Sequence, residues 1–293
     1  MYGIENLYKA NSVRDAISAI QENPGAKFMA GGTDVLIKVK EGKLASCVLV
    51  DICDISELSV IYIDKDAIHI GPLATFSQVA TDPIVLKHVP ILAEAALTFG
   101  GPQLRNMGTI GGNIANGATS ADIIPSLLTL NAELKLESSK GVRLLQLSEF
   151  YISSGKTVLA QDELIVDISI RTSDYEGYFG HYLKYSRRMA LDIATLNCAC
   201  LCRFTPDLGS VAGLRLAFGV AGPIPMRAYK TEQAVTGLPI REAFDAVGQL
   251  SAEEVKPRTS ARASREFRLS LARELSRRTL EKAILNAGGT LNI

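Results

Sequence analysis

Two glycine-containing stretches in the first half of the chain carry the residue types that bind phosphate groups. The first is Lys27-Phe-Met-Ala-Gly-Gly-Thr-Asp34, where a short apolar run stops at two glycines and is followed by a hydroxyl, a carboxylate and a helical pattern. Gly31 and Gly32 lack Cβ atoms, so the turn can adopt positive φ and a ligand can approach the main chain closely. A strand, bare backbone and the start of a helix together present amide N–H groups to a phosphate.

The same stretch also fits a plainer interpretation, an ordinary turn between a strand and a helix. Thr33 or Asp34 would then cap a helix over Val35–Val39, because both residue types are common at that position. Two glycines and a capping residue occur often at such turns. Taken alone, this stretch therefore favours the capped turn over a ligand site, and other parts of the sequence are needed to distinguish the two.

The second stretch covers residues 100–117, with six glycines in eighteen residues and few large apolar side chains. Each glycine costs about 0.5–1 kcal/mol relative to alanine in a helix or strand, so we do not expect regular structure throughout. Long irregular segments of compact domains are usually functional. Thr33, Thr109 and Asn113 have short polar side chains that suit phosphate oxygens. Two such loops could surround a pyrophosphate, which favours a ligand site at the first stretch as well.

Several common classes of site are not indicated. The Gly-x-Gly-x-x-Gly and Gly-x-x-x-x-Gly-Lys-Ser/Thr fingerprints are both missing, so nucleotide binding here needs a different fold. The three histidines are scattered and no Cys-x-x-Cys pair occurs, which argues against a zinc hydrolase. Cys198, Cys200 and Cys202 alternate along an apolar run. They could begin a metal site, but we expect buried thiols on one face of a strand.

The composition describes a globular protein without a bulk charge that would attract nucleic acid. The 293 residues include 31 Lys plus Arg and 31 Asp plus Glu, and 47% of them are hydrophobic. No run approaches the ~20 apolar residues that span a bilayer, and the N-terminal residues show no signal-peptide pattern. We therefore expect a cytoplasmic protein with neither a membrane nor a nucleic acid as partner.

Hydrophobic patterns predict an α+β protein of two domains that would position these stretches. Residues 1–55 are expected to form a small β-α-β unit, and residues 56–175 a larger part with two hairpins, several helices and a strand over 163–171. A polar segment over 173–180 marks the boundary with residues 176–293, where three strands followed by three helices predict an α+β layer. The strands are expected over 182–186, 197–203 and 214–220, and the helices over 228–235, 240–255 and 264–287.

Together, these motifs resemble the flavin subunits of molybdenum hydroxylases, with the FAD-binding subunits of bacterial three-subunit xanthine dehydrogenases as the nearest group. Each motif is moderately specific, and their joint presence in family order covers nearly the whole chain. The motifs are Phe28-Met-Ala-Gly-Gly-Thr-Asp-Val-Leu36, Gly101-x-Gln-x-Arg-Asn-x-Gly-Thr-Ile-Gly-Gly-Asn113, Ser120-x-Asp122, Lys184-Tyr-Ser-Arg-Arg-x-x-x-Asp-Ile-Ala194, the strand at Leu214–Arg227, and Arg262-Ala-Ser-x-Glu-Phe-Arg268.

The resemblance implies a vanillyl-alcohol-oxidase (PCMH)-type FAD-binding domain over residues 1–175, with subdomains 1–55 and 56–175 and FAD held between them. Residues 176–293 would form the C-terminal α+β domain of molybdenum hydroxylase flavoproteins, a three-stranded sheet with helices. FAD would be bound without a covalent link, because no His or Cys lies in either glycine-containing stretch.

The resemblance also implies cofactor-binding roles by position. The first stretch would cradle the pyrophosphate through its backbone amides, and residues of the second would meet it from the other side. These residues are Lys27, Phe28, Met29, Ala30, Gly31, Gly32, Thr33, Asp34, Thr109, Ile110, Gly111, Gly112 and Asn113. Phe99 would pack on the adenine, Asp122 would hydrogen-bond the ribityl or ribose hydroxyls, and Ile165 would contact the flavin. Lys184, the one residue with an implied catalytic role, would lie near the isoalloxazine ring, where a cation stabilises a reduced, anionic flavin.

Plainer roles stay open for several of these residues. Phe99 could belong to the core, and Asp122 could cap a helix over Ile123–Leu130. Lys184 taken alone would more often be a solvated lysine. The arginine-rich stretch Arg258–Arg278 is interpreted as a solvated helix face or a subunit contact.

The resemblance implies an electron-transfer function for this chain, as an oxidoreductase subunit. FAD would take electrons from the [2Fe-2S] clusters of an iron–sulfur subunit and pass hydride to NAD⁺, while a molybdenum-cofactor subunit oxidises hypoxanthine or xanthine. The iron–sulfur and molybdopterin ligands are expected only in those partner subunits, because this chain lacks Cys-x-x-Cys spacing. The alternatives are the same role in a complex that oxidises nicotinate, another N-heterocycle or carbon monoxide, and a non-catalytic nucleotide-binding or scaffold protein.

Overall fold

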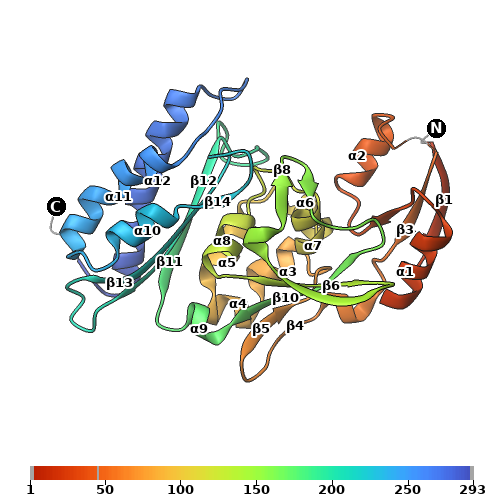
Figure 1. The fold of residues 1–293 in the computed structure, drawn as a ribbon, viewed down its shortest axis with the longest axis horizontal. Helices are drawn as coiled ribbons and strands as arrows, with labels where there is room; N and C mark the ends of the chain where they lie inside the picture. The colour runs from red at the N-terminus through yellow and green to blue at the C-terminus, as the bar shows by residue number, and fades with distance from the viewer. Residues whose placement is uncertain (1–2, 45, 291–293) are drawn as a thin grey trace.

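A computed structural model describes residues 3–44 and 46–290 of the chain. Its N-terminal part is a three-stranded parallel sheet in the order β1-β3-β2. Parallel neighbours need crossover connections, and helices supply them here (Figure 1). The first strand, β1, was not predicted from the sequence. The elements are β1 (Ile4–Lys9), α1 (Val13–Glu22), β2 (Lys27–Met29), α2 (Val35–Lys40) and β3 (Cys47–Asp51).

The central part is a five-stranded antiparallel sheet, in the order β4-β5-β10-β6-β7, covered by short helices. Ile68, Leu134 and Ile168 are fully buried beneath those helices and belong to the largest core. The strands are β4 (Ile61–Ile63), β5 (Ala67–Ile70), β6 (Glu133–Ser138), β7 (Gly141–Gln146) and β10 (Leu164–Arg171). The helices are α3 (Phe76–Thr81), α4 (Pro83–His88), α5 (Pro90–Leu97), α6 (Pro102–Met107), α7 (Ile110–Ala115) and α8 (Ile124–Thr129).

Four smaller elements complete this central part and lead out of it. They are the 3₁₀ turns η1 (Ser56–Ser59) and η2 (Leu147–Glu149), the hairpin of β8 (Tyr151–Ser153) and β9 (Lys156–Thr157), and α9 (Thr172–Tyr175). The segment after α9 leads into the C-terminal sheet. We propose the domain boundary there, between Tyr175 and Glu176.

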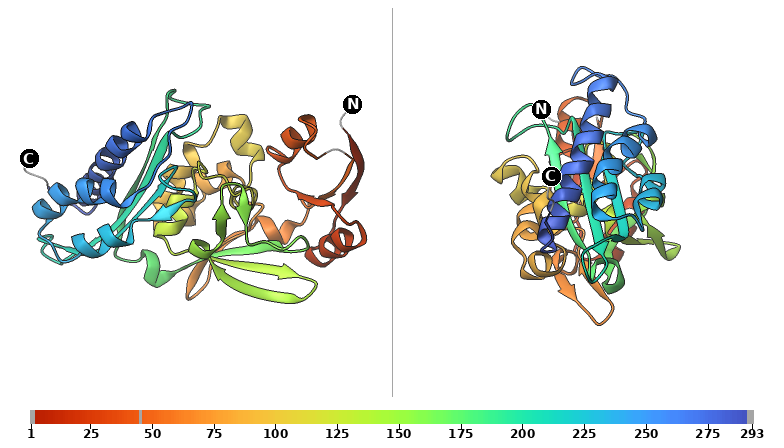
Figure 2. Two further views of the ribbon diagram at one scale, coloured as in Figure 1. Left: turned by 45° about the horizontal axis from the view of Figure 1, so that its top comes forward. Right: turned by 90° about the vertical axis from the view of Figure 1, so that its left-hand side faces the viewer.

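The C-terminal part is an antiparallel sheet with helices on one face, and the central part lies against its other face (Figures 1 and 2). The predicted three strands are present, and a fourth of two residues follows them. As predicted, Cys198, Cys200 and Cys202 are buried; Cys198 Sγ lies 3.6 Å from Thr279 Oγ1 of the last helix. The elements are β11 (Phe179–Tyr185), β12 (Leu196–Phe204), β13 (Val211–Gly219), β14 (Met226–Arg227), α10 (Tyr229–Val235), α11 (Ile240–Glu254) and α12 (Arg265–Asn286).

The glycine-dense segment 100–117 is more regular than its composition suggested, because α6 and α7 occupy twelve of its residues. Pro102 begins α6, where a missing N–H costs nothing. Within α7, Gly111 allows close packing, since a Cβ there would lie 2.4 Å from Pro72 Cβ. The packing that glycine permits therefore compensates for its low helix propensity.

The arginine-rich stretch Arg258–Arg278 is only partly the solvated helix face that we expected. Arg278 is exposed and pairs with Glu274 on the surface of α12. Arg268, one turn into the same helix, is only 2% exposed. For Arg268 the solvated interpretation is therefore wrong, because the side chain reaches backbone carbonyls inside the protein rather than water.

Two arginines of the C-terminal sheet attach it to the central helices. Arg215 donates to the carbonyl oxygens of Thr129 (3.1 Å) and Asp174 (2.7 Å) and pairs with the Asp174 carboxylate at 3.0 Å. Arg227 forms a bidentate ion pair with Glu232 and also donates a hydrogen bond to Asn131 Oδ1. These buried contacts fix the orientation of the sheet against the rest of the chain.

Arg215→Met is expected to lower the free energy of unfolding by about 3 kcal/mol, because it leaves the half-buried Asp174 carboxylate without its cation. Arg278→Met is the matched control. It removes an exposed pair on α12, so we expect a change below about 1 kcal/mol. Urea unfolding of both variants measures the difference, and equal losses would contradict a structural role for the Arg215 contacts.

Candidate functional site

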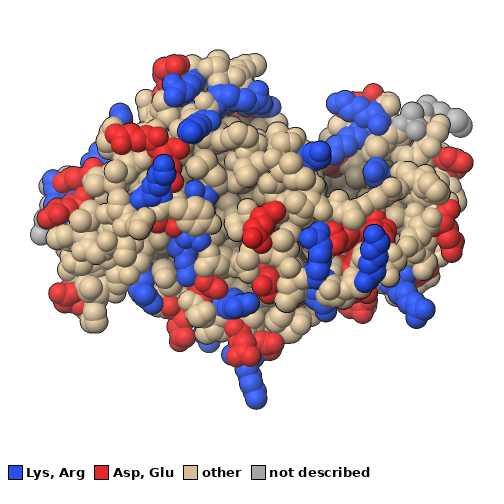
Figure 3. All heavy atoms as spheres, in the orientation of Figure 1, with Lys and Arg blue, Asp and Glu red and all other residues tan. Residues whose placement is uncertain are grey.

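A cavity of about 430 Å³ lies between the N-terminal sheet and the central helices. This volume is within the usual range for sites that enclose a small molecule. Both glycine-containing stretches line the cavity, together with residues 157–165 that lead into β10. Figure 3 shows the surface hollowed beside the N-terminal part, which is on the right in that view.

Most of the residues that the sequence singled out come together here. Those that line the cavity are Lys27, Phe28, Ala30, Gly31, Gly32, Thr33, Asp34, Phe99, Thr109, Gly111, Gly112, Asn113 and Ile165. Met29, Ile110, Asp122 and Lys184 do not line it. Ile110 is fully buried in the central core, and Met29 packs against the apolar cluster of Val39, Cys47 and Leu49.

The first stretch offers free backbone donors. Among the described residues, the amide N–H groups of Gly31, Gly32 and Thr33 have no hydrogen-bond acceptor. Gly32 has φ +70°, a conformation that suits glycine. The predicted cap is not formed, because neither Thr33 nor Asp34 bonds an amide at the start of α2. The turn therefore presents its amides to the cavity without an internal partner.

In the second stretch, by contrast, backbone amides already donate hydrogen bonds within the protein. Ile110 N–H donates to Ala74 O (2.9 Å), Gly111 N–H to Pro72 O (2.8 Å), and Gly112 N–H to Thr109 Oγ1 (3.1 Å). It offers a side chain instead, since Asn113 Oδ1 is buried with no hydrogen-bond partner in the described part of the chain. A buried acceptor without a partner is costly, so a ligand that brings a hydrogen-bond donor to Asn113 Oδ1 would be favoured.

The two stretches touch each other through main-chain atoms. A Cβ built on Gly31 would lie 1.6 Å from Met107 O, at the end of α6. No side chain can occupy that position unless the two walls separate. A second contact joins the two walls of the cavity: Lys38 Nζ of α2 donates to Asn116 Oδ1, in the second stretch, at 2.8 Å.

An aromatic pair forms the apolar side of the cavity. The rings of Phe76 and Phe99 are stacked, with centroids 3.9 Å apart. Phe76 is fully buried and Phe99 half-buried, so Phe99 belongs both to the core and to the cavity wall. Sequence reasoning missed Phe76, Lys38 and Asn116. Of these, only Lys38 had a signal, because it follows Asp34 by four residues and so shares its helix face.

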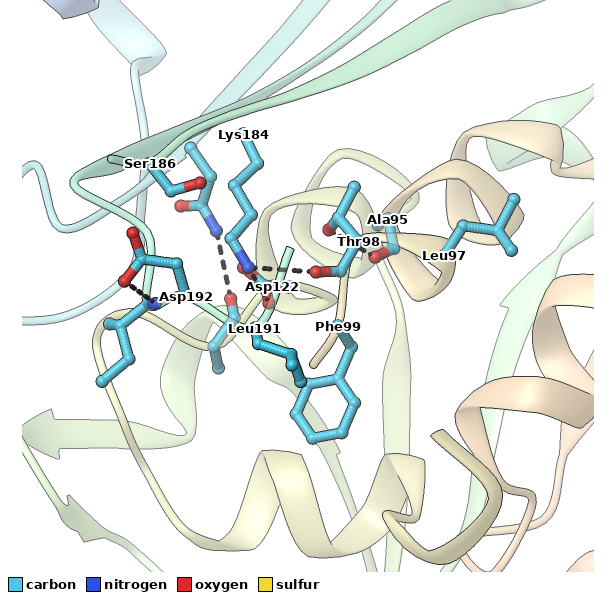
Figure 4. A network of polar contacts seen from close by, with 12 residues as sticks. Ala95, Leu97, Thr98, Phe99, Asp122, Lys184, Ser186, Leu191 and Asp192 are labelled. Carbon is cyan, nitrogen blue, oxygen red and sulfur yellow. Dashed lines mark hydrogen bonds and ion pairs between the residues drawn. The ribbon is translucent and has the colours of Figure 1, made fainter. Parts of the chain in front are cut away.

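Asp122 and Lys184 form a buried ion pair behind Phe99 (Figure 4). Their oxygen and nitrogen atoms are 2.8 Å apart, and Lys184 Nζ also donates to Thr98 O at 3.0 Å. Tyr182, from the same strand as Lys184, donates to Asp122 at 3.4 Å. Burial raises the pKa of Asp122 to about 6, although Lys184 opposes this shift.

Both plainer interpretations of this pair are wrong. No side chain caps α8, so Asp122 does not serve that helix. Only 7% of the Lys184 side chain is exposed, so it is not solvated. The pair instead holds the Thr98 carbonyl, immediately before Phe99, and thereby supports the cavity wall.

The rest of the described chain shows no competing site of the kinds considered. No group of three His, Cys, Asp or Glu residues within 3–44 and 46–290 is arranged to hold a metal ion. No described helix is both long and apolar enough to cross a membrane. Acidic and basic side chains are interspersed over the face in Figure 3.

Comparison with family models divides the chain into two matching parts. Residues 3–171 match the FAD binding domain in molybdopterin dehydrogenase. Residues 181–283 match the CO dehydrogenase flavoprotein C-terminal domain. These matches confirm the family that the motifs indicated.

Individual relatives cover almost the whole chain. It is 39% identical to the xanthine dehydrogenase FAD-binding subunit of Escherichia coli O157:H7, over 99% of this chain and 100% of that one. It is 31% identical to the nicotinate dehydrogenase FAD-subunit of Eubacterium barkeri, over 73% and 72%. The structure of carbon monoxide dehydrogenase from Hydrogenophaga pseudoflava superposes with a TM-score of 0.92 at 28% identity, covering 98% of this chain and 99% of that chain. This structural likeness confirms the predicted fold class.

Lys184→Met is expected to destabilise the fold by about 3–5 kcal/mol at about pH 8, because it strands the Asp122 carboxylate in the interior. Lys184 lowers the pKa of Asp122, so removing it moves that pKa above about 6. Between the ordinary value of 3.8 and this higher native pKa, the folded variant binds a proton that the unfolded chain does not. Stability therefore falls as the pH rises through this window, and urea unfolding measures a smaller loss at about pH 5.

The double variant Lys184→Met/Asp122→Leu removes both charges and serves as the control. It should recover most of the stability that the single variant loses. Above about pH 6, its stability should depend on pH in the same way as that of the wild type. An equal loss at both pH values for the single variant would contradict a buried charge pair.

Proposed function

The chain belongs to the family of FAD-binding domains in molybdopterin dehydrogenases, and we propose that it is the FAD-carrying electron-transfer subunit of a xanthine dehydrogenase-type molybdenum hydroxylase. In this proposal, a molybdenum-cofactor subunit oxidises hypoxanthine or xanthine and an iron–sulfur subunit relays the electrons. NAD⁺ is the proposed acceptor, and a cytoplasmic location is part of the same proposal. The 39% identity to a xanthine dehydrogenase FAD-binding subunit along the whole chain supports the purine assignment.

The cavity between the two glycine-containing stretches is the observation that carries the proposal. One wall carries the unpartnered amides of Gly31, Gly32 and Thr33, and Asn113 lines the opposite wall. A pyrophosphate has oxygens enough to accept from all three amides. Phe99 offers a flat apolar surface for a ring, with Phe76 stacked behind it. The residues present therefore fit FAD.

When bound, FAD would supply the redox chemistry, accepting electrons singly from a [2Fe-2S] cluster and giving up a pair as hydride. The residues of this chain would hold it in place. The amides of the first stretch would bind the pyrophosphate, and Ile165 would contact the flavin from β10. No His or Cys is among the described residues that line the cavity, which supports non-covalent binding.

The four singled-out residues outside the cavity lining keep narrower roles in this proposal. Met29 and Ile110 direct their side chains into apolar cores, and Ile110 N–H already donates to Ala74 O, so they would shape the two stretches rather than contact FAD. Lys184 is paired with Asp122 and is not a free cation. We therefore propose that Lys184 tunes the flavin as one half of that pair, while the pair fixes the Thr98 carbonyl before Phe99.

A related complex with another substrate is the second candidate. It is favoured by the matches to a nicotinate dehydrogenase FAD-subunit and to a carbon monoxide dehydrogenase. The flavin-binding residues would have the same role in either complex, because the proposed substrate site lies in the molybdenum subunit.

Gly32→Val is expected to weaken FAD binding by at least about 100-fold, because a β-branched side chain opposes φ +70° and its Cβ would lie 3.1 Å from Leu36 Cδ1, so the turn that carries the free amides must shift. Gly42→Val is the matched control. Gly42 has φ +73° and open space around it, and it does not line the cavity. Flavin fluorescence titration should therefore find normal affinity for Gly42→Val, and equal loss in both variants would mean that backbone strain alone is responsible.

Purifying the chain with its partner subunits tests the function as a whole. The complex is expected to be yellow and to reduce NAD⁺ when xanthine or hypoxanthine is added. Activity with nicotinate or carbon monoxide in place of purines would shift the assignment to the second candidate. A folded complex that contains no flavin and cannot be reconstituted with FAD would contradict both.

A further inference from the structure

Arg268 is a buried cation that the proposed function leaves without a role. Its Nε donates to Thr195 O at 3.1 Å, and its terminal nitrogens donate to Arg258 O and, at 2.7 Å, to Ser260 Oγ. No carboxylate pairs with it in the described part of the chain. Its side chain therefore joins three separate points: the start of β12 and two positions in the loop before α12.

Such a cation is expensive to bury. Taking a charge out of water costs several kcal/mol unless polar partners compensate, and an apolar side chain often serves stability as well. Two nearby guanidiniums, Arg258 and Arg262, add to the cost and, with burial, lower the pKa of Arg268. The contacts of Arg268 are better explained by the geometry that they impose, because only a forked donor reaches all three acceptors.

The segment that ends at Thr195 needs such an anchor. Residues 186–194 form an irregular loop between β11 and β12, closed at its base by Thr195 N–H donating to Tyr185 O at 2.8 Å. Its large apolar side chains, Met189, Leu191 and Ile193, are exposed by 105%, 57% and 46%. The loop therefore has little apolar packing, and it is held by polar contacts within the loop, such as Arg188 N–H to Asp192, and by the anchor at its base.

This loop lies against the Phe99 end of the cavity. A Cβ built on Gly101 would lie 2.7 Å from Leu191 Cδ2, so the loop touches the chain two residues after Phe99. Figure 4 labels Leu191 and Phe99 in the same view as the Lys184–Asp122 pair. Leu191 has φ +54°, an unusual conformation for a leucine, which the surrounding contacts must maintain.

We propose that Arg268 is a positioning residue that holds the 186–194 loop against the Phe99 wall of the cofactor cavity. The helix that carries Arg268 belongs to the C-terminal part, so the last helix of the chain acts on the cavity through this loop. The proposal rests on the proposed function only in taking the cavity as the FAD site.

Hydrogen exchange on the full chain, with and without FAD, tests this role in Arg268→Met. Amides of residues 186–195 are expected to exchange about tenfold faster or more, because a hydrogen bond to a charged group is lost at the base of the loop. FAD affinity is expected to fall about tenfold as the Phe99 wall loosens. Arg268→Lys keeps the charge but reaches fewer acceptors, so it should give an intermediate result.

Leu275→Ala is the matched control for general destabilisation. Leu275 lies two turns further along α12, is buried in the same core, and makes none of the Arg268 contacts. It should lower stability while leaving exchange in 186–195 and FAD affinity unchanged. Ser260→Ala removes a single acceptor and gives a milder variant in case Arg268→Met does not fold; it should move both readouts in the same direction by a smaller factor.

Two outcomes would overturn the proposal: unchanged exchange in 186–195 in the Arg268 and Ser260 variants, or changes that Leu275→Ala reproduces at equal loss of stability. The experiment also separates this proposal from the function. A wild-type chain that binds no FAD contradicts the function, whereas the exchange of the loop without FAD still tests the anchor.

Discussion

The contact between the Gly31 main chain and the Met107 carbonyl is the constraint on which the cavity depends. The apolar core of the N-terminal sheet includes Leu73 and Leu164 of the central part, so apolar burial joins the two parts. At Gly31 the two backbones meet with no room for a Cβ. This contact sets the separation of the walls, and the Lys38–Asn116 hydrogen bond maintains it further along. Glycine is therefore required here for close approach, whereas Gly32 is suited to its backbone conformation.

Support for the other end of the cavity comes from the C-terminal sheet. Lys184 of β11 reaches across to Asp122 and to the Thr98 carbonyl, and so fixes the chain just before Phe99. The Arg215 contacts and the hydrogen bond from Arg227 to Asn131 hold the sheet in the orientation that makes this reach possible. A cavity between the first two parts of the chain thus has a wall that the third part supports. The C-terminal part therefore supports the cavity structurally even though none of its described residues lines it.

Local patterns in the sequence predicted much of this structure, because they report local physics. The apolar stripe of residues 264–287 predicted α12 within a residue at each end, and Ser264 does cap it. The alternation of Cys198, Cys200 and Cys202 predicted one buried face of a strand. The first glycine stretch was also placed correctly, since a strand, two glycines and a helix start are signals within ten residues.

The features that the sequence did not predict involve contacts between residues far apart in the chain. Asp122 and Lys184 are sixty-two residues apart, and nothing near either one reveals that they pair. Within 100–117, α7 packs against Pro72 through Gly111, and this contact between distant residues outweighs the low helix propensity of glycine. In the sequence Arg268 resembles its exposed neighbours, because two of its three acceptors are backbone carbonyls, which no sequence pattern reveals.

A structure of the chain with FAD bound tests the central claim most directly. The account predicts that the pyrophosphate lies between the two glycine-containing stretches, with its oxygens within about 3 Å of the amide nitrogens of Gly31, Gly32 and Thr33. Asn113 should contact the cofactor from the opposite wall. A pyrophosphate bound elsewhere, with these three amides still unpartnered, would contradict it.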